Sequence, residues 1–377
     1  MNNLIKNKIT FFSPTMKRTG SEIVLLNLLN HINNIYIIKI VSKYKGELLN
    51  KIQKRIDTDF LYRYLPINIL IRILNRCKRI IYIPYKLNKY KNSTWYVNTI
   101  VLPDIIKYAK ENKIKTIVHV HELEQIFNLL SVNALENLIN YPDLIIANSQ
   151  ATERVLNKYG RTKKIKICYP AIDTSSIIKN KENYISFRKK LKIGSNKFVW
   201  AMCGTLDENK NPFLFIDIAY EILKTHHFTN FIWIGEGKNT SLEILCKQKS
   251  LEMGLSEKII WITDPGNDYL NYFNTADGFF LTSKKESFSL TTIEALLLEL
   301  PIVANDCDGV REILQDSIGK TIAQENAKGM AMEMINYMDK KSIHDIEKGK
   351  QIAFQFDIKL VEKQWNEILK TYFEQIT

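Results

Sequence analysis

The fold of this chain is decided by the stretch Thr282-Ser283-Lys284-Lys285-Glu286-Ser287-Phe288-Ser289-Leu290-Thr291-Thr292-Ile293-Glu294-Ala295-Leu296. It follows an apolar run, Gly278–Leu281, that predicts a buried strand, and it turns into a helical pattern over Leu290–Leu300. The first turn of such a helix offers unpaired N–H groups and the positive end of its dipole to an anion. We therefore expect a phosphate site at this turn.

Similar strand and helix patterns alternate through the rest of the 377 residues. This order is typical of parallel sheets covered on both faces by helices. The other expected strands are Lys8–Phe12, Tyr36–Val41, Trp95–Asn98, Thr116–His121, Leu144–Asn148, Ile165–Tyr169, Phe198–Cys203, Phe231–Ile234, Ile259–Ile262 and Ile302–Ala304, and the other expected helices include Glu22–Asn33, Pro212–Lys224, Ser241–Met253 and Val310–Leu314.

The length of the chain predicts two domains, since a single hydrophobic core stops growing before this size. The boundary is expected after Tyr169-Pro170, where a polar stretch precedes a new series of strands. The first domain then covers residues 1–172, and the second covers residues 173–356. Both are expected to be doubly wound α/β domains, whose ligands bind at the carboxyl ends of the strands.

The positive charge of the chain belongs to its first part. Residues 1–170 carry 28 Lys and Arg against 11 Asp and Glu, whereas the rest carries 25 against 29. Because the chain has no nucleic-acid-binding signature, a phosphate-bearing substrate or an anionic membrane is the expected partner, and nucleic acid is not.

The cysteines and the N-terminus predict a cytoplasmic protein. The five cysteines are scattered without a C-x-x-C pair, which argues against a disulfide framework or a zinc site. Residues 1–12 contain too short an apolar run for a signal peptide, and no stretch is apolar enough to span a membrane.

Glu286 and Glu294, seven residues apart, carry a resemblance to a known family. Together with Thr282-Ser283, Phe288 and Leu300-Pro301-Ile302-Val303, they resemble the E-x7-E frame of the family 4 retaining glycosyltransferases. The resemblance implies the GT-B fold: two facing Rossmann-like domains, with a C-terminal helix at 357–377 that crosses back to the first. It also implies transfer of a sugar from a nucleoside diphosphate sugar to an acceptor hydroxyl, with retention.

The same resemblance assigns roles in the second domain. Glu286 is one of two expected catalytic residues, and it positions sugar hydroxyls, while Glu294 contacts the ribose. Lys210 resembles a lysine that binds the donor diphosphate, although Thr205 and Asn211 stand where the family usually has Arg and Gly. The other expected donor-binding residues are Gly204, Ser287, Phe288, Ser289, Leu290 and Thr291.

In the first domain, His121 is the second expected catalytic residue, because it resembles the family's H-(D/E) site, whose histidine faces the transferred sugar. His119 is expected to face the opposite side of the strand and to lie in the core. Thr19 and Gly20 resemble the Gly-rich loop that approaches the acceptor and the diphosphate.

The expected partners are a nucleotide sugar and a saccharide or lipid-linked saccharide acceptor, as in surface polysaccharide or glycolipid biosynthesis. No cofactor or metal is expected, and the D-x-D match Asp306-Cys307-Asp308 is interpreted as part of a loop. Thr205 and Asn211 leave open a catalytically silent GT-B scaffold, and a sugar-nucleotide epimerase remains a third reading.

The segment Ile67–Ile81 has a broad apolar arc opposite Arg72, Arg76 and Arg79. It predicts either a core helix with a solvated basic face or peripheral attachment to an anionic membrane. Because residues 51–100 carry 11 basic against 2 acidic side chains, the membrane reading is favoured.

Overall fold

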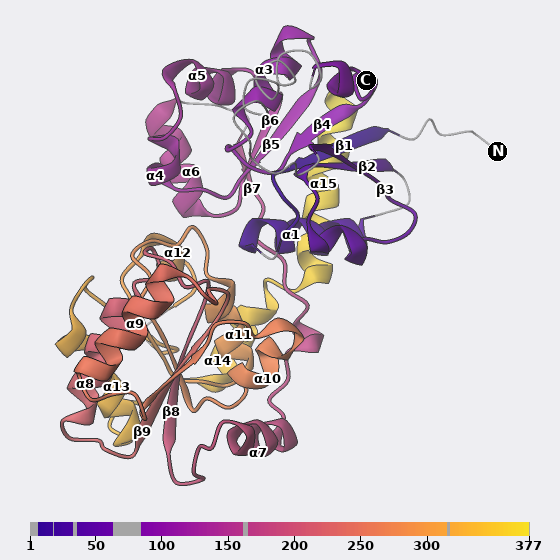
Figure 1. The fold of residues 1–377 in the computed structure, drawn as a ribbon. Coiled ribbons are helices and arrows are strands. Elements are labelled where there is room, and N and C mark those ends of the chain that lie inside the picture. The colour runs from indigo at the N-terminus through magenta and orange to yellow at the C-terminus, as the bar shows by residue number, and fades with distance from the viewer. Residues whose placement is uncertain are drawn as a thin grey trace. The chain divides into compact units, whose positions relative to one another are not determined.

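The structure is a computed structural model that describes residues 7–17, 19–32, 36–62, 84–160, 165–314 and 317–376. The chain divides into two compact units, Met1–Ile172 together with Phe356–Thr377, and Asp173–Gln355 (Figure 1). Each unit is a parallel sheet with helices between its strands, so the two doubly wound domains predicted from the sequence are confirmed.

The first unit contains a seven-stranded sheet in the order β3-β2-β1-β4-β5-β6-β7. The direction of strand succession reverses between β1 and β4, which is where ligands bind in such sheets. The strands are β1 (Lys8–Ser13), β2 (Ile37–Tyr44), β3 (Asp57–Tyr62), β4 (Thr94–Val97), β5 (Thr116–Val120), β6 (Leu144–Ala147) and β7 (Ile165–Ile167), and the helices are α1 (Gly20–His31), η1 (Glu47–Lys51), α3 (Pro103–Glu111), α4 (Glu124–Phe127), α5 (Val132–Asn140), α6 (Gln150–Tyr159) and α15 (Ile358–Ile376).

The second unit contains a six-stranded sheet in the order β10-β9-β8-β11-β12-β13, with the reversal between β8 and β11. Its strands are β8 (Phe198–Cys203), β9 (Thr229–Ile234), β10 (Ile259–Ile262), β11 (Gly278–Leu281), β12 (Ile302–Asn305) and β13 (Lys320–Ile322), and its helices are η2 (Thr174–Ser176), α7 (Lys181–Lys190), α8 (Pro212–Leu223), α9 (Ser241–Glu252), η3 (Gly266–Asp268), α10 (Tyr269–Phe273), α11 (Leu290–Leu297), α12 (Asp308–Arg311), α13 (Ala327–Met338) and α14 (Ile346–Phe354).

Two edge strands were not expected from the sequence. β3 contains Asp57 and Asp59, whose side chains interrupt any apolar run, and β13 is only three residues long. Strands at the edge of a sheet need less apolar side-chain area than central ones, so they lack the pattern that reveals β8 or β11.

The C-terminal helix α15 packs against α1 of the first unit, as the expected fold requires. Its Trp365 is fully buried, lies beside Phe11, and donates an indole N–H hydrogen bond to Tyr96 Oη at 3.1 Å. Ile172, where the chain leaves this unit, hydrogen-bonds to the backbone of Phe356 and Ile358, where the chain returns.

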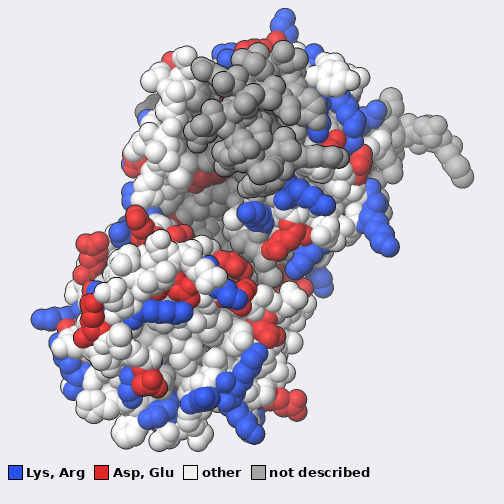
Figure 2. Space-filling model, viewed as in Figure 1, with Lys and Arg blue, Asp and Glu red and all other residues white. Residues whose placement is uncertain are grey.

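The surface of the second unit carries both signs of charge. Acidic and basic side chains are interspersed over it on the face that Figure 2 shows. Within the described parts of the chain, no helix is long and apolar enough to span a membrane. The predicted amphipathic helix Ile67–Ile81 lies outside the described residues.

Candidate functional site

Lys210 and Glu286 form an ion pair at the carboxyl ends of the neighbouring strands β8 and β11. The turns that hold them are tied together, because Lys284 N donates to Asn209 O at 2.7 Å and Thr282 Oγ1 donates to Lys210 O at 2.6 Å. The two charged side chains are only 18% and 10% exposed. The structure therefore brings together the predicted phosphate-binding lysine and the predicted catalytic glutamate.

The ion pair keeps Lys210 protonated. Burial alone would lower the pKa of this lysine, but attraction and hydrogen bonding to the Glu286 carboxylate outweigh burial, and the pKa is raised. A positive charge thus lies within the second unit, largely shielded from water. Interactions with an anionic ligand are stronger in such surroundings than at an exposed lysine.

Gly204 provides the space that the Lys210 side chain occupies. Its φ of +152° lies in a region that favours glycine, and a Cβ there would be 2.9 Å from Lys210 Cε. Gly235 on the next turn is needed for a similar reason, because its Cβ would lie 1.9 Å from the Gly204 carbonyl oxygen. Thr205 follows in an exposed position on the same turn.

Asn211 preserves the backbone shape for which a glycine would be suited. Its φ of 53° and ψ of 61° are left-handed, and asparagine tolerates this conformation better than most residues. The Asn211 side chain also caps α8 by accepting from Leu214 N at 3.4 Å, and Pro212 occupies the first helical position. The departure from the family pattern at this position therefore leaves the turn intact.

The helix α11 begins at Leu290, where the sequence predicts its N-terminus. Ser289 caps it by accepting from Thr292 N at 3.3 Å, and the Thr292 hydroxyl bonds to Ser289 Oγ at 2.8 Å. Thr291 lies in the first turn, 3.2 Å from the same hydroxyl. The turn before the helix contains Ser287 and Phe288, of which Phe288 is buried.

The turn of Glu286 is packed tightly against the loop before α12. Gly309 N donates to the Glu286 carbonyl at 3.0 Å, and a Cβ on Gly309 would lie 2.5 Å from the backbone of Ser287. Buried polar atoms of Ser283 and Asn305 beside this turn have no hydrogen-bond partner among the described residues. Such atoms are free to bind a ligand or an ordered water.

Glu294 lies on α11 and accepts a hydrogen bond from Tyr269 Oη at 2.6 Å. Burial raises the pKa of Glu294 to about 7, although the bond from Tyr269 lowers it. One carboxylate oxygen is thus held by the tyrosine. Sequence analysis missed Tyr269, because α10 is distant in sequence and no motif marks it.

His121 follows the last residue of β5, and its Nε2 lies 3.1 Å from Asn98 Oδ1. Burial lowers the pKa of His121 to about 3. His119 is fully buried, as expected, with Nδ1 2.8 Å from Tyr96 Oη. The expectation that the two histidines face opposite sides is wrong, since their ring centroids are 4.1 Å apart. Side chains at positions i and i+2 of a strand lie on the same face.

The loop between β1 and α1 is held by the carboxylate of Glu22, which is 1% exposed. It accepts from Met16 N at 2.5 Å and Lys17 N at 3.0 Å, and the Thr19 hydroxyl donates to it at 3.0 Å. A Cβ on Gly20 would meet no atom within 4 Å, so the packing around it does not require a glycine. Thr19 is therefore tied to Glu22 directly before α1, and Gly20, the first residue of this helix, has open space beside it.

Asp306 and Asp308 of the D-x-D match both pair with Arg311. Asp306 makes a two-point contact with its guanidinium, and Asp308 lies 3.6 Å away. In the described ranges, no three His, Cys, Asp or Glu side chains are placed to hold a metal ion.

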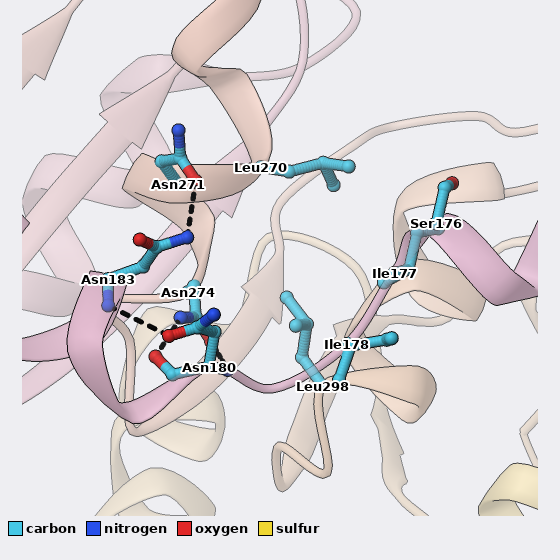
Figure 3. A pocket seen from close by; sticks show the side chains of 9 residues that line it. All are labelled: Ser176, Ile177, Ile178, Asn180, Asn183, Leu270, Asn271, Asn274 and Leu298. Carbon is cyan, nitrogen blue, oxygen red and sulfur yellow. Dashed lines mark hydrogen bonds between the residues drawn. The ribbon is translucent and has the colours of Figure 1, made fainter.

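A separate cavity of about 280 Å³ lies in the second unit, near Leu298 after the C-terminal end of α11 (Figure 3). Its asparagine side chains form hydrogen bonds with neighbouring side chains and backbone, as in the bond from Asn183 Nδ2 to Asn271 Oδ1 at 2.9 Å. Asn274 Oδ1 likewise accepts from the backbone of Asn180 at 3.2 Å. The residues predicted to bind the donor do not line this cavity.

Comparison with known proteins relates the second unit to glycosyltransferases. Residues 183–351, which lie in the second unit, match the family described as "Glycosyl transferases group 1". An uncharacterized glycosyltransferase of Methanocaldococcus jannaschii is 23% identical over 226 residues, which are 58% of this chain and 54% of that protein. The O-antigen biosynthesis glycosyltransferase WclY of Escherichia coli is 24% identical over 183 residues, 48% of each chain. The matched region thus spans about half the length of these curated relatives.

The fold of the whole chain is similar to that of a solved structure. HepE of Anabaena, crystallised in complex with UDP and glucose, superposes with a TM-score of 0.82 at 18% identity, over 97% of this chain and 99% of that one. The GT-B fold predicted from the sequence is confirmed.

Proposed function

We propose that this chain transfers a glycosyl group from a nucleoside diphosphate sugar to an acceptor hydroxyl, with retention at the anomeric carbon. The observation that carries the proposal is the shielded Lys210–Glu286 pair at the carboxyl ends of β8 and β11, with Glu286 in the turn that leads into α11. A cation, a carboxylate and a helix N-terminus are suited to a sugar joined to a diphosphate. The match of residues 183–351 supports the same reaction.

The departing diphosphate gains negative charge as its bond to the anomeric carbon breaks. Lys210 and the first N–H groups of α11 stabilise this charge, and one such donor contributes on the order of a hundredfold to turnover. Glu286 then accepts hydrogen bonds from sugar hydroxyls, while the free oxygen of Glu294 accepts from the ribose. The acceptor hydroxyl attacks from the face that the diphosphate leaves, and its proton passes to the departing phosphate oxygen.

The test uses a panel of nucleoside diphosphate sugars. A bound donor at a hundred times its dissociation constant stabilises the folded chain by roughly 2.7 kcal/mol, which thermal unfolding detects. With the donor that binds, Glu286→Ala should chiefly lower kcat, whereas Glu294→Ala should chiefly weaken donor binding. The site assignment is wrong if neither substitution changes transfer, and the anomeric configuration of the product decides retention.

A catalytically silent scaffold that binds nucleotide sugars is the second candidate. Thr205 favours it, because a hydroxyl on this turn cannot supply the two charged N–H contacts of an arginine. Donor binding without nucleotide release would support the scaffold. Interconversion of donor sugars without an acceptor would instead support a sugar-nucleotide epimerase.

The acceptor that we propose is a saccharide or lipid-linked saccharide of surface polysaccharide or glycolipid biosynthesis, used by a cytoplasmic enzyme at the inner face of the membrane. The basic segment Ile67–Ile81 and the name of the WclY relative support this context. The wild type should sediment with acidic liposomes at low salt, and a variant with Arg72→Glu, Arg76→Glu and Arg79→Glu should not. Equal sedimentation of the two proteins, or none, contradicts membrane attachment.

A further inference from the structure

We infer that Asn98 is a positioning residue that fixes the tautomer of His121, so that His121 Nδ1 is a hydrogen-bond acceptor for a substrate hydroxyl. The inference rests on the proposed function for the identity of the substrate. The tautomer itself follows from the hydrogen bonds of the first unit.

The orientation of the Asn98 amide is set from one side. Asn98 directly follows β4 and is fully buried, and its Nδ2 donates to the Ser21 carbonyl at 3.1 Å. A carbonyl oxygen can only accept, so the NH₂ group must face Ser21. The opposite orientation would place two carbonyl oxygens against each other inside the protein.

The orientation of Asn98 in turn decides which nitrogen of His121 carries the proton. Asn98 Oδ1 faces His121 Nε2 at 3.1 Å and can only accept, so Nε2 must be the protonated nitrogen. In a neutral ring this leaves Nδ1 with a lone pair. No described residue forms a hydrogen bond with Nδ1, and His121 is 9% exposed.

The groups around His121 keep the ring neutral. The Glu122 carboxylate accepts hydrogen bonds from the Thr99 hydroxyl and from His121 N, the latter at 2.9 Å, and among the described residues no carboxylate forms an ion pair with the His121 ring. The neighbouring ring of His119 is neutral as well, because burial lowers the pKa of this fully buried histidine well below its ordinary value.

The remaining titratable group near this pair is Cys168. Burial raises the pKa of its thiol to about 12, so it brings no charge. Burial also lowers the pKa of His121 itself.

The chemistry that His121 recognises follows from this state. A lone pair at Nδ1 binds a group that donates a proton, such as a sugar hydroxyl, and it repels a carboxylate oxygen. We therefore expect His121 to select a neutral, hydroxyl-bearing position of the substrate.

The first experiment is nuclear magnetic resonance of the full chain with ¹⁵N-labelled histidine. Long-range ¹H–¹⁵N spectra identify the protonated nitrogen of each ring, and His121→Gln assigns the signal. We expect the Nε2–H tautomer and no titration between pH 5 and 8. A proton on Nδ1, or titration in this range, overturns the inference. This result is independent of any transfer activity, so it is separate from the failure of the proposed function.

The second experiment replaces the amide of Asn98 by a carboxylate in Asn98→Asp. The matched control is Asn274→Asp, because Asn274 is also a buried asparagine but lies in the second unit. The new carboxylate favours the charged imidazole, which donates from both nitrogens. We expect His121 to titrate in this variant, and kcat/KM for transfer to fall about tenfold below the new pKa, the loss typical of one hydrogen bond. The control should keep the wild-type pH profile. Identical profiles for Asn98→Asp and the wild type overturn the positioning role.

Discussion

At the scale of single residues, Glu294 makes the stability of the second unit depend on pH. Its pKa of about 7 lies above the ordinary value of 4.5, so between these values the folded state holds a proton that the unfolded state has released. The free energy of unfolding therefore falls as the pH rises through this window. A glutamine side chain cannot ionise, so Glu294→Gln should remove this pH dependence. Over the whole window, the dependence amounts to about 3 kcal/mol in the free energy of unfolding.

Urea unfolding at pH 4.5 and pH 8 checks this expectation. Glu208→Gln is the control, because Glu208 is exposed on the same unit. Parallel pH profiles of the wild type and Glu294→Gln would show that the Glu294 carboxyl is solvated in the folded state.

Thr205 is a position where a substitution can add a phosphate-binding side chain. Because Thr205 is exposed on the turn beside Lys210, Thr205→Arg should fit without loss of stability. A guanidinium binds a diphosphate through two N–H contacts, so the affinity for a nucleoside diphosphate should rise about tenfold. Calorimetric titration measures this, with Thr205→Gln as an uncharged control. Unchanged or weaker binding by the arginine variant would mean that this turn does not face the diphosphate.

At the scale of elements, the turn before α8 has Asn211 in a left-handed conformation that glycine would adopt more easily. Asn211→Ala should lower the free energy of unfolding by about 2 kcal/mol, since alanine is strained at a φ of 53° and the helix cap is lost. Asn211→Gly should cost clearly less, because glycine adopts this conformation freely. Urea unfolding of the two variants measures the difference. If the two variants lose equal free energy of unfolding, Asn211 stabilises the unit through its helix cap and not through its left-handed backbone.

The elements that the sequence predicts best are those with continuous apolar runs or helix-entry residues. β8, β11 and the start of α11 at Leu290 belong to this class, because burial on both faces leaves a pattern in adjacent residues. β3 and β13 lack such a pattern.

Contacts between distant segments are harder to predict than elements. The motif frame singles out Glu286 and Lys210. The partner of Glu294, Tyr269, comes from the helix α10, and the partner of His121, Asn98, follows the strand β4. Only the order of strands in space brings these pairs together, and no local pattern encodes that order.

At the scale of the whole molecule, α15 makes the C-terminus part of the first unit. Trp365→Ala should lower the free energy of unfolding of that unit by about 3 to 5 kcal/mol, since it empties a fully buried site beside Phe11 and Tyr96. Trp365→Phe should cost less, because it keeps the ring contacts and loses the hydrogen bond to Tyr96 Oη. Denaturant unfolding followed by fluorescence measures both. If Trp365→Ala unfolds at the same denaturant concentration as the wild type, α15 contributes little to the stability of this core.

The pairing of Ile172 with Phe356 and Ile358 has a consequence for modularity. The first unit is interrupted in the chain at Ile172 and resumes at Phe356, and these two points are hydrogen-bonded neighbours. Residues 173–355 therefore form an insertion whose two junctions coincide in space. Recombination at the junctions could exchange this insertion for that of another protein and leave the host sheet unbroken. Under the function proposed above, donor preference would then be inherited with this insertion, separately from acceptor preference.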